Sequence, residues 1–273
     1  MKKLFMYFAL AVTVLAMPGM AHATEIYGWT LDLSSYGGTT ITDIYQLSVY
    51  GQGHITQDFG GDGVLSNGDA FSVSSVLYTI GYTDTNGVYY NNPDFGTDLE
   101  LFFVSDNLAG VITNVAADGS FQYEYQSGTV SLYLGDSSDI AGSTLLADLD
   151  LAWGLGDSTS VNLGGNALAG STDLGLQILT AVLGGLISFD PADYPELAAL
   201  YPNLSTFFTF DLNNNLNDSG SITNPVFTAN GFTATVTTGG DITLVATPEP
   251  STFLILGFGL LGLVGFRRKF KKA

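Results

Sequence analysis

The residues of this chain that could do chemistry are almost all carboxylates. Its 273 residues include 26 aspartates and glutamates, no cysteine and two histidines, of which only His54 lies beyond residue 23. All seven lysines and arginines lie in the first three or the last seven residues. The body between these ends therefore has no lysine base, arginine clamp or thiol nucleophile, and it cannot neutralise nucleic-acid phosphates.

One acidic loop has a spacing that suits calcium. Asp58, Asp62 and Asp69 stand at positions 1, 5 and 12 of the segment, with a glycine at position 6, and hard cations prefer several oxygens on a tightly turned loop. Position 3 is Gly60 rather than an oxygen ligand, and the flanking segments look like strands instead of EF-hand helices. The loop is either a calcium site, the only cofactor the sequence suggests, or a solvated turn.

Other acidic patterns are less specific. Residues 211–218 alternate oxygen-bearing side chains, which suits either a cation or an asparagine-rich turn. Two carboxylates at positions i and i+2 of a strand could serve a glycosidase, but in so acidic a chain such pairs arise by chance. These pairs are Asp98 with Glu100 and Asp148 with Asp150. Because His54 also has no serine and aspartate pattern beside it, we expect a protein that is not an enzyme.

Aromatic residues offer a second kind of site. Tyr89 and Tyr90 precede an Asn-Asn-Pro segment typical of a loop, where their flat rings could stack on sugars. In the run 121–126 the aromatic residues alternate with polar ones, so Tyr123 and Tyr125 are expected to pack in a core. The sequence thus predicts sugar stacking at Tyr89 and Tyr90.

The elements that must position these residues are mainly strands. Alternating runs rich in threonine, valine and aromatic residues recur through the body, and Asp118-Gly119 and Asn230-Gly231 read as hairpin turns between them. One helix is predicted over residues 174–187. The pattern favours a mostly β fold, an antiparallel β-sandwich formed by a single acidic domain of residues 24–247.

The N-terminus has the pattern of a secretory signal peptide. Lys2 and Lys3 precede an apolar run from Leu4 to Met17, and small residues at Ala21 and Ala23 mark a cleavage site. We expect residues 1–23 to be removed after export.

The C-terminus carries three ordered elements over residues 248–273. Pro248, Glu249 and Pro250 come first, followed by a glycine-interrupted apolar run from Phe253 to Phe266. A basic cluster then closes the chain with Arg267, Arg268 and Lys269. The run of 14 residues would span about 21 Å as a helix, less than the roughly 30 Å of a bilayer core, so it predicts a short and marginal transmembrane anchor with a cytoplasmic tail.

These elements resemble the PEP-CTERM sorting signal of Gram-negative bacteria. The resemblance covers about 26 residues and implies recognition in the inner membrane by an exosortase, a transpeptidase that cuts near the Pro-Glu-Pro motif. It also implies transient anchoring and a final location at the cell surface or in the extracellular matrix. The stretch 63–71 is similar to PEP-CTERM proteins associated with flocculation.

Together these features favour a non-catalytic surface or matrix protein that contributes to exopolysaccharide, biofilm or floc organisation. A carbohydrate-binding module and a carboxylate-dependent glycosidase are the alternatives. The expected partners are the exosortase and matrix polysaccharide.

Overall fold

Strands make up most of the described chain, as the alternating pattern predicts. The computed structural model describes residues 24–91, 93–96, 98–118, 120–158, 170–178, 185–190, 192–194, 208–216 and 222–246. Two short 3-10 helices occur, η1 (Ser34–Tyr36) and η2 (Ile140–Gly142). The strands are β1 (Thr24–Ile26), β2 (Trp29–Asp32), β3 (Thr40–Asp58), β4 (Ala70–Asp84), β5 (Tyr89–Asn91), β6 (Glu100–Val115), β7 (Phe121–Ser127), β8 (Thr129–Gly135), β9 (Thr144–Ser158), β10 (Gly170–Ile178), β11 (Ile187–Ser188), β12 (Phe208–Leu216), β13 (Ile222–Thr228) and β14 (Gly231–Ala246).

Chain contacts divide the protein into two units. One unit, Glu25–Ala246, contains the sheet, and the other consists of the two ends, Met1–Thr24 and Thr247–Ala273. Apart from Thr24, these ends lie outside the described residues, and so do the predicted cleavage site and the predicted sorting signal with its short helix. Within the described part of the chain, no helix has the length and apolar character needed to cross a membrane.

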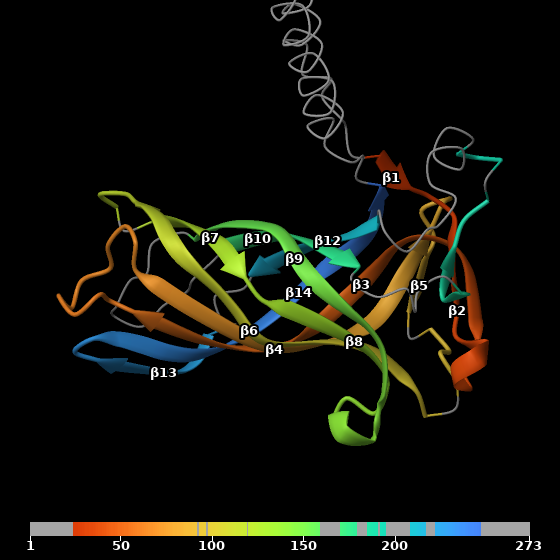
Figure 1. Cartoon of the computed structure of the whole chain (residues 1–273), viewed down its shortest axis with the longest axis horizontal. Coiled ribbons are helices and arrows are strands. Elements are labelled where there is room, and N and C mark those ends of the chain that lie inside the picture. Colours follow the sequence, from red (N-terminus) through yellow and green to blue (C-terminus); the bar gives the residue numbers. More distant parts are fainter. Residues whose placement is uncertain are drawn as a thin grey trace, which may run out of the picture. The chain divides into compact units, whose positions relative to one another are not determined.

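The strands form one sheet that closes on itself. Neighbouring positions follow the order β3, β4, β6, β7 with β8, β9, β10, β12 and β14, and all these pairs are antiparallel. Closure comes from the pairing of β14 with β3, which runs from Gly231 opposite Asp58 to Thr243 opposite Gln46. Figure 1 shows the blue β14 alongside the orange-red β3.

The predicted sandwich is therefore corrected to a barrel-like closed sheet. A sandwich would require two sheets packed face to face, whereas here the last strand of the meander pairs with the first long one. Alternation in the sequence shows that each strand buries one face. It does not show whether that face meets a second sheet or the inside of its own sheet.

The inside of the closed sheet holds the core. Its fully buried side chains include Leu47, Leu101, Leu132, Leu149 and Ile242, each exposed by 1% or less. Burying a leucine side chain contributes about 1.5–3 kcal/mol, so this leucine-rich interior accounts for much of the driving force for closure.

Two local predictions are confirmed. Phe121, Tyr123 and Tyr125 share the inner face of β7, and Tyr125 is fully inside the core, where burial raises the pKa of its hydroxyl. The hairpin predicted from Asn230-Gly231 is present: β13 and β14 are antiparallel, Ala229 and Asn230 form the turn, and Gly231 begins β14. Short-range turn chemistry and strict alternation were sufficient signals in both cases.

The predicted helix at 174–187 is wrong where the structure describes it. Residues 170–178 form β10, in which Leu174 and Leu176 are both buried. Their spacing of two residues fits a strand, and pairing with β9 and β12 on both edges outweighs any local helical preference. Residues 179–184 lie outside the described chain.

Candidate functional site: an aromatic row on the outer face

A row of aromatic residues crosses four strands on the outer face of the closed sheet. Tyr50 of β3 lies opposite Tyr78 of β4, Tyr78 opposite Phe102 of β6, and Phe102 opposite Tyr133 of β8. Residues paired in this way share a face, and strands lie about 4.8 Å apart, so the row extends over about 14 Å. We term these four residues the aromatic row.

Alternation along each strand turns the row outward. Val49, Leu77 and Phe103 are adjacent in sequence to members of the row, and each is buried on the opposite, inner face. Tyr50 is 41% exposed, whereas Phe102 is 0% exposed although it belongs to the outer face. Phe102 therefore supports the tyrosines on either side of it, and the tyrosines provide the accessible rings.

The rings are held by contacts with one another. The Tyr50 and Tyr78 ring centroids lie 5.8 Å apart in an edge-to-face arrangement, and those of Phe102 and Tyr133 lie 5.5 Å apart with planes 13° from parallel. Burial raises the pKa of Tyr78, and the charges of Tyr50 and Glu100 act in the same direction. Tyr78 thus stays neutral at physiological pH and offers an apolar ring with a polar tip.

Carboxylates flank the row on both sides. Asp241 accepts a hydrogen bond of 2.9 Å from the Ser48 hydroxyl, and Ser48 lies two residues before Tyr50 on the same face of β3. Asp148 accepts one of 2.7 Å from the Ser131 hydroxyl, and Ser131 lies two residues before Tyr133.

Glu100 completes this flanking set on β6, two residues before Phe102, and accepts a hydrogen bond of 3.1 Å from the Ser137 amide. The outer face therefore combines flat rings with fixed hydrogen-bond acceptors. It carries no positive charge, because the body has no lysine or arginine.

The sequence-predicted pair Tyr89 and Tyr90 does not form a single platform. Both belong to β5, where consecutive side chains point to opposite faces, and they are 49% and 41% exposed. Tyr90 stacks on Tyr82 with centroids 4.7 Å apart and planes 9° from parallel. The Tyr89 ring instead passes over Gly81, at a position where any Cβ would collide with its hydroxyl.

The Asp84 carboxylate holds this β4–β5 turn. Its Oδ1 accepts hydrogen bonds from the amides of Asn86 and Val88, at 2.9 and 2.8 Å, and its Oδ2 accepts one of 3.3 Å from the Tyr90 hydroxyl. These bonds stabilise the charged form, first of all the bond from Val88, and lower the pKa of Asp84.

The acidic loop between β3 and β4 contains the three predicted calcium ligands. Asp58 accepts from the Gly60 amide, Asp62 from the Val64 amide and Asp69 from the Ser66 amide, at 3.0, 2.9 and 2.6 Å. Each carboxylate thus caps its own short turn. Among the residues that the structure describes, no three acidic or histidine side chains gather as a metal site, so calcium binding here stays a prediction.

The remaining sequence-derived sites are dispersed. His54 is exposed on the outer face of β3, opposite Ser74 and Thr235. Of the paired carboxylates, Asp148 and Asp150 each accept a hydrogen bond from a hydroxyl of β8. Residues 211–216 are strand, part of β12, and not the expected turn.

Sequence reasoning missed the aromatic row. Its members are separated by more than twenty residues each, and only the register of four strands places them together. The sequence did contain one signal of the row. Tyr50, Tyr78 and Tyr133 each stand at a position where an alternating strand carries its outward-facing, polar residues.

Comparison with known proteins identifies one segment. The PEP-CTERM protein-sorting motif matches residues 246–269, which confirms the resemblance drawn from the three C-terminal elements. No curated protein and no solved structure matches the chain.

Proposed function

Because the chain carries a PEP-CTERM protein-sorting motif, which indicates an exosortase-sorted extracellular protein, we propose that it is a non-enzymatic matrix protein that holds exopolysaccharide on its aromatic row. The observation that carries the proposal is the alignment of Tyr50, Tyr78 and Tyr133 on one outer face with carboxylates beside them. Organisation of biofilm or flocs is the cellular role that follows from such binding.

The row suits sugar chemistry. Each pyranose presents a face of C–H groups, which packs on an aromatic ring, and a rim of hydroxyls, which donate hydrogen bonds. A row of about 14 Å accommodates a short stretch of chain rather than one sugar. Asp241, Glu100 and Asp148 are positioned at its edges to accept hydrogen bonds from the sugar hydroxyls.

Charge selects the class of polysaccharide. The body carries 25 of the chain's 26 acids and no lysine or arginine, so a uronate-rich chain would meet only repulsion at low salt. Neutral polysaccharides, or polymers with free amino sugars, meet no such barrier. We therefore assign neutral or amino-sugar exopolysaccharide as the partner.

We propose binding without catalysis because carboxylates of the body are already held by other groups of the sheet. Described carboxylates such as Asp84, Asp148 and Asp241 are engaged by hydroxyl or amide donors of their own sheet. The outer face thus provides fixed acceptors for binding.

Binding of the exported protein to the host's purified exopolysaccharide tests the proposal directly. The double variant Tyr50→Ala/Tyr133→Ala should weaken binding by about 5- to 150-fold, because each stacked ring contributes about 0.5–1.5 kcal/mol. Phe227→Ala is the matched control, since Phe227 is 48% exposed but belongs to β13, away from the row. Full binding by the double variant would overturn the proposal.

Two further measurements distinguish the proposal from a sugar site at Tyr90 and from an enzyme. Loss of binding in Tyr90→Ala alone would move the site to the β4–β5 turn. Release of reducing sugar from the polysaccharide would instead show an enzyme. In cells, a deletion strain that regains settling with the wild-type gene but not with the double variant would connect the row to floc organisation.

A further inference from the structure

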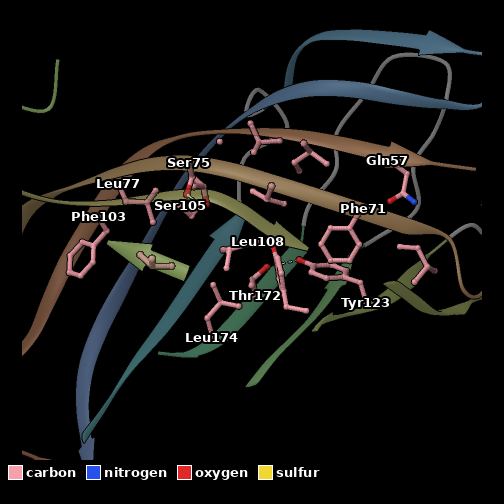
Figure 2. A pocket seen from close by; sticks show the side chains of 18 of the residues that line it. Gln57, Phe71, Ser75, Leu77, Phe103, Ser105, Leu108, Tyr123, Thr172 and Leu174 are labelled. Atoms are coloured by element: carbon pink, nitrogen blue, oxygen red, sulfur yellow. Dashed lines mark hydrogen bonds between the residues drawn. The ribbon is translucent and has the colours of Figure 1, made fainter. Parts of the chain in front are cut away.

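A cavity of about 100 Å³ lies inside the closed sheet. Figure 2 shows side chains from several strands converging on it, with Phe71 and Tyr123 on one side and Leu174 on another. This cavity is on the opposite face of the sheet from the aromatic row and is independent of the function proposed above.

Small residues on three adjacent strands account for the cavity. Gly53 of β3 lies opposite Ser75 of β4, and Ser75 lies opposite Ser105 of β6. The inward row two residues away is large by comparison, with Leu77 opposite Phe103. Large side chains therefore fill the interior at one level of the sheet, and small ones leave it hollow at the next. A closed sheet with eight strand positions around it is wide enough to hold one small ligand.

The walls are mainly aromatic and aliphatic. Phe71 makes edge-to-face contacts with Tyr123 and Tyr125, at centroid distances of 5.4 and 5.0 Å. Leu108 and Leu174 also line the space. Such walls favour an apolar molecule, because its burial removes apolar surface from water.

The polar groups of the cavity include two pairs of hydroxyls, and Gln57, which also lines it, donates hydrogen bonds to the carbonyls of Asp58 and Ala70. Ser75 and Ser105 are bonded at 2.8 Å, and the hydroxyls of Tyr123 and Thr172 are bonded to each other. A hydroxyl that donates one hydrogen bond can still accept another, so each pair can form a hydrogen bond with one polar group of a ligand.

Charge restricts the ligand further. Among the described residues that line the cavity, none is ionisable at neutral pH, and the body has no lysine or arginine that could pair with an anion. A buried ion without a partner is strongly unfavourable. The ligand must therefore be neutral.

We propose that this cavity binds a small uncharged molecule, largely apolar and with one hydroxyl or carbonyl group. A benzene-sized ligand occupies a cavity of about 150 Å³, whereas this cavity is about 100 Å³, so the expected size is about four non-hydrogen atoms. 2-Propanol is a probe of this size and chemistry, and acetate is its charged counterpart.

The test is ligand-observed NMR together with thermal unfolding of the exported full-length protein. 2-Propanol should bind and raise the Tm, and acetate should do neither. Gly53→Val should weaken binding at least tenfold and should not lower the Tm. A Cβ at Gly53 meets its neighbours at ordinary contact distances, 3.4 Å or more, and the added methyls would enter the cavity.

A second filling variant protects the test against misfolding. Ser75→Val/Ser105→Val replaces both members of a hydroxyl pair, so no orphaned donor is left. Ser74→Val is its control, because Ser74 adjoins Ser75 but lies opposite the exposed His54 on the outer face. The proposal is overturned if the wild-type protein does not bind 2-propanol, if the filled variants bind 2-propanol equally well, or if the wild-type protein binds acetate.

Discussion

Phe102 of β6 and Tyr133 of β8 stack across the outer face of the sheet, with centroids 5.5 Å apart and planes 13° from parallel. Phe102 is 0% exposed at this position. An outward-facing residue is thus as buried as a core residue, and the Tyr133 ring lies stacked on it. This contact connects the stability of the sheet to the surface proposed to bind polysaccharide.

Removal of the Phe102 ring should destabilise the protein strongly. We expect Phe102→Ala to lower the free energy of unfolding by about 3–5 kcal/mol, as for other buried phenylalanines. Urea unfolding followed by circular dichroism measures this change. Leu145→Ala, at a residue that is 46% exposed and lies opposite Tyr133, should change it by about 0.5 kcal/mol or less.

Two glycines of β3 should respond differently to the same substitution. A Cβ at Gly51 would collide with the backbone of Val76 and Leu77, whereas one at Gly53 meets only ordinary contacts. Gly51→Ala should therefore reduce the Tm by several degrees, and Gly53→Ala should leave it unchanged or raise it. Equal effects of the two variants in a thermal melt would contradict the packing described here.

Tyr27 should titrate at unusually high pH. Its hydroxyl donates a hydrogen bond of 2.7 Å to Glu25, which is the main cause that raises its pKa to about 12. The raised value means that the bond stabilises the fold fully below pH 10 and that this contribution is lost as pH rises from about 10 to 12. Ultraviolet titration should show less tyrosinate between pH 10 and 12 in wild type than in Glu25→Gln.

Asp84 should make the fold sensitive to acid. The amides of Val88 and Asn86 lower its pKa below 3.8, so its stabilising effect is present above about pH 4 and is lost as pH falls through the folded-state pKa. Asp84→Asn should show a smaller decline of Tm between pH 5 and pH 2 than wild type. A parallel decline in both proteins would show that Asp84 has no part in acid unfolding.

Salt should stabilise the protein without selecting calcium. The chain has a net charge of −19, so screening by sodium chloride should raise the Tm at low ionic strength. Because Asp58, Asp62 and Asp69 each cap a separate turn, calcium and magnesium at equal ionic strength should act alike. A calcium-specific rise in Tm that Asp62→Asn removes would instead establish the predicted calcium loop.

The sequence by itself determined the features that depend on near neighbours. Alternation placed Phe121, Tyr123 and Tyr125 on one buried face, Asn230-Gly231 marked a hairpin, and the C-terminal elements identified the sorting motif. Each of these signals lies within one continuous stretch of the sequence, so no distant partner is needed to interpret it.

Only the tertiary structure decided how the strands meet. The pairing of β3 with β14 joins residues almost two hundred positions apart and turns an expected sandwich into a closed sheet. The same register aligns Tyr50 with Tyr78 on the outer face and Gly53 with Ser75 on the inner one. A shift of one residue would exchange the two faces, and the sequence of a single strand carries no record of which partner residue lies opposite.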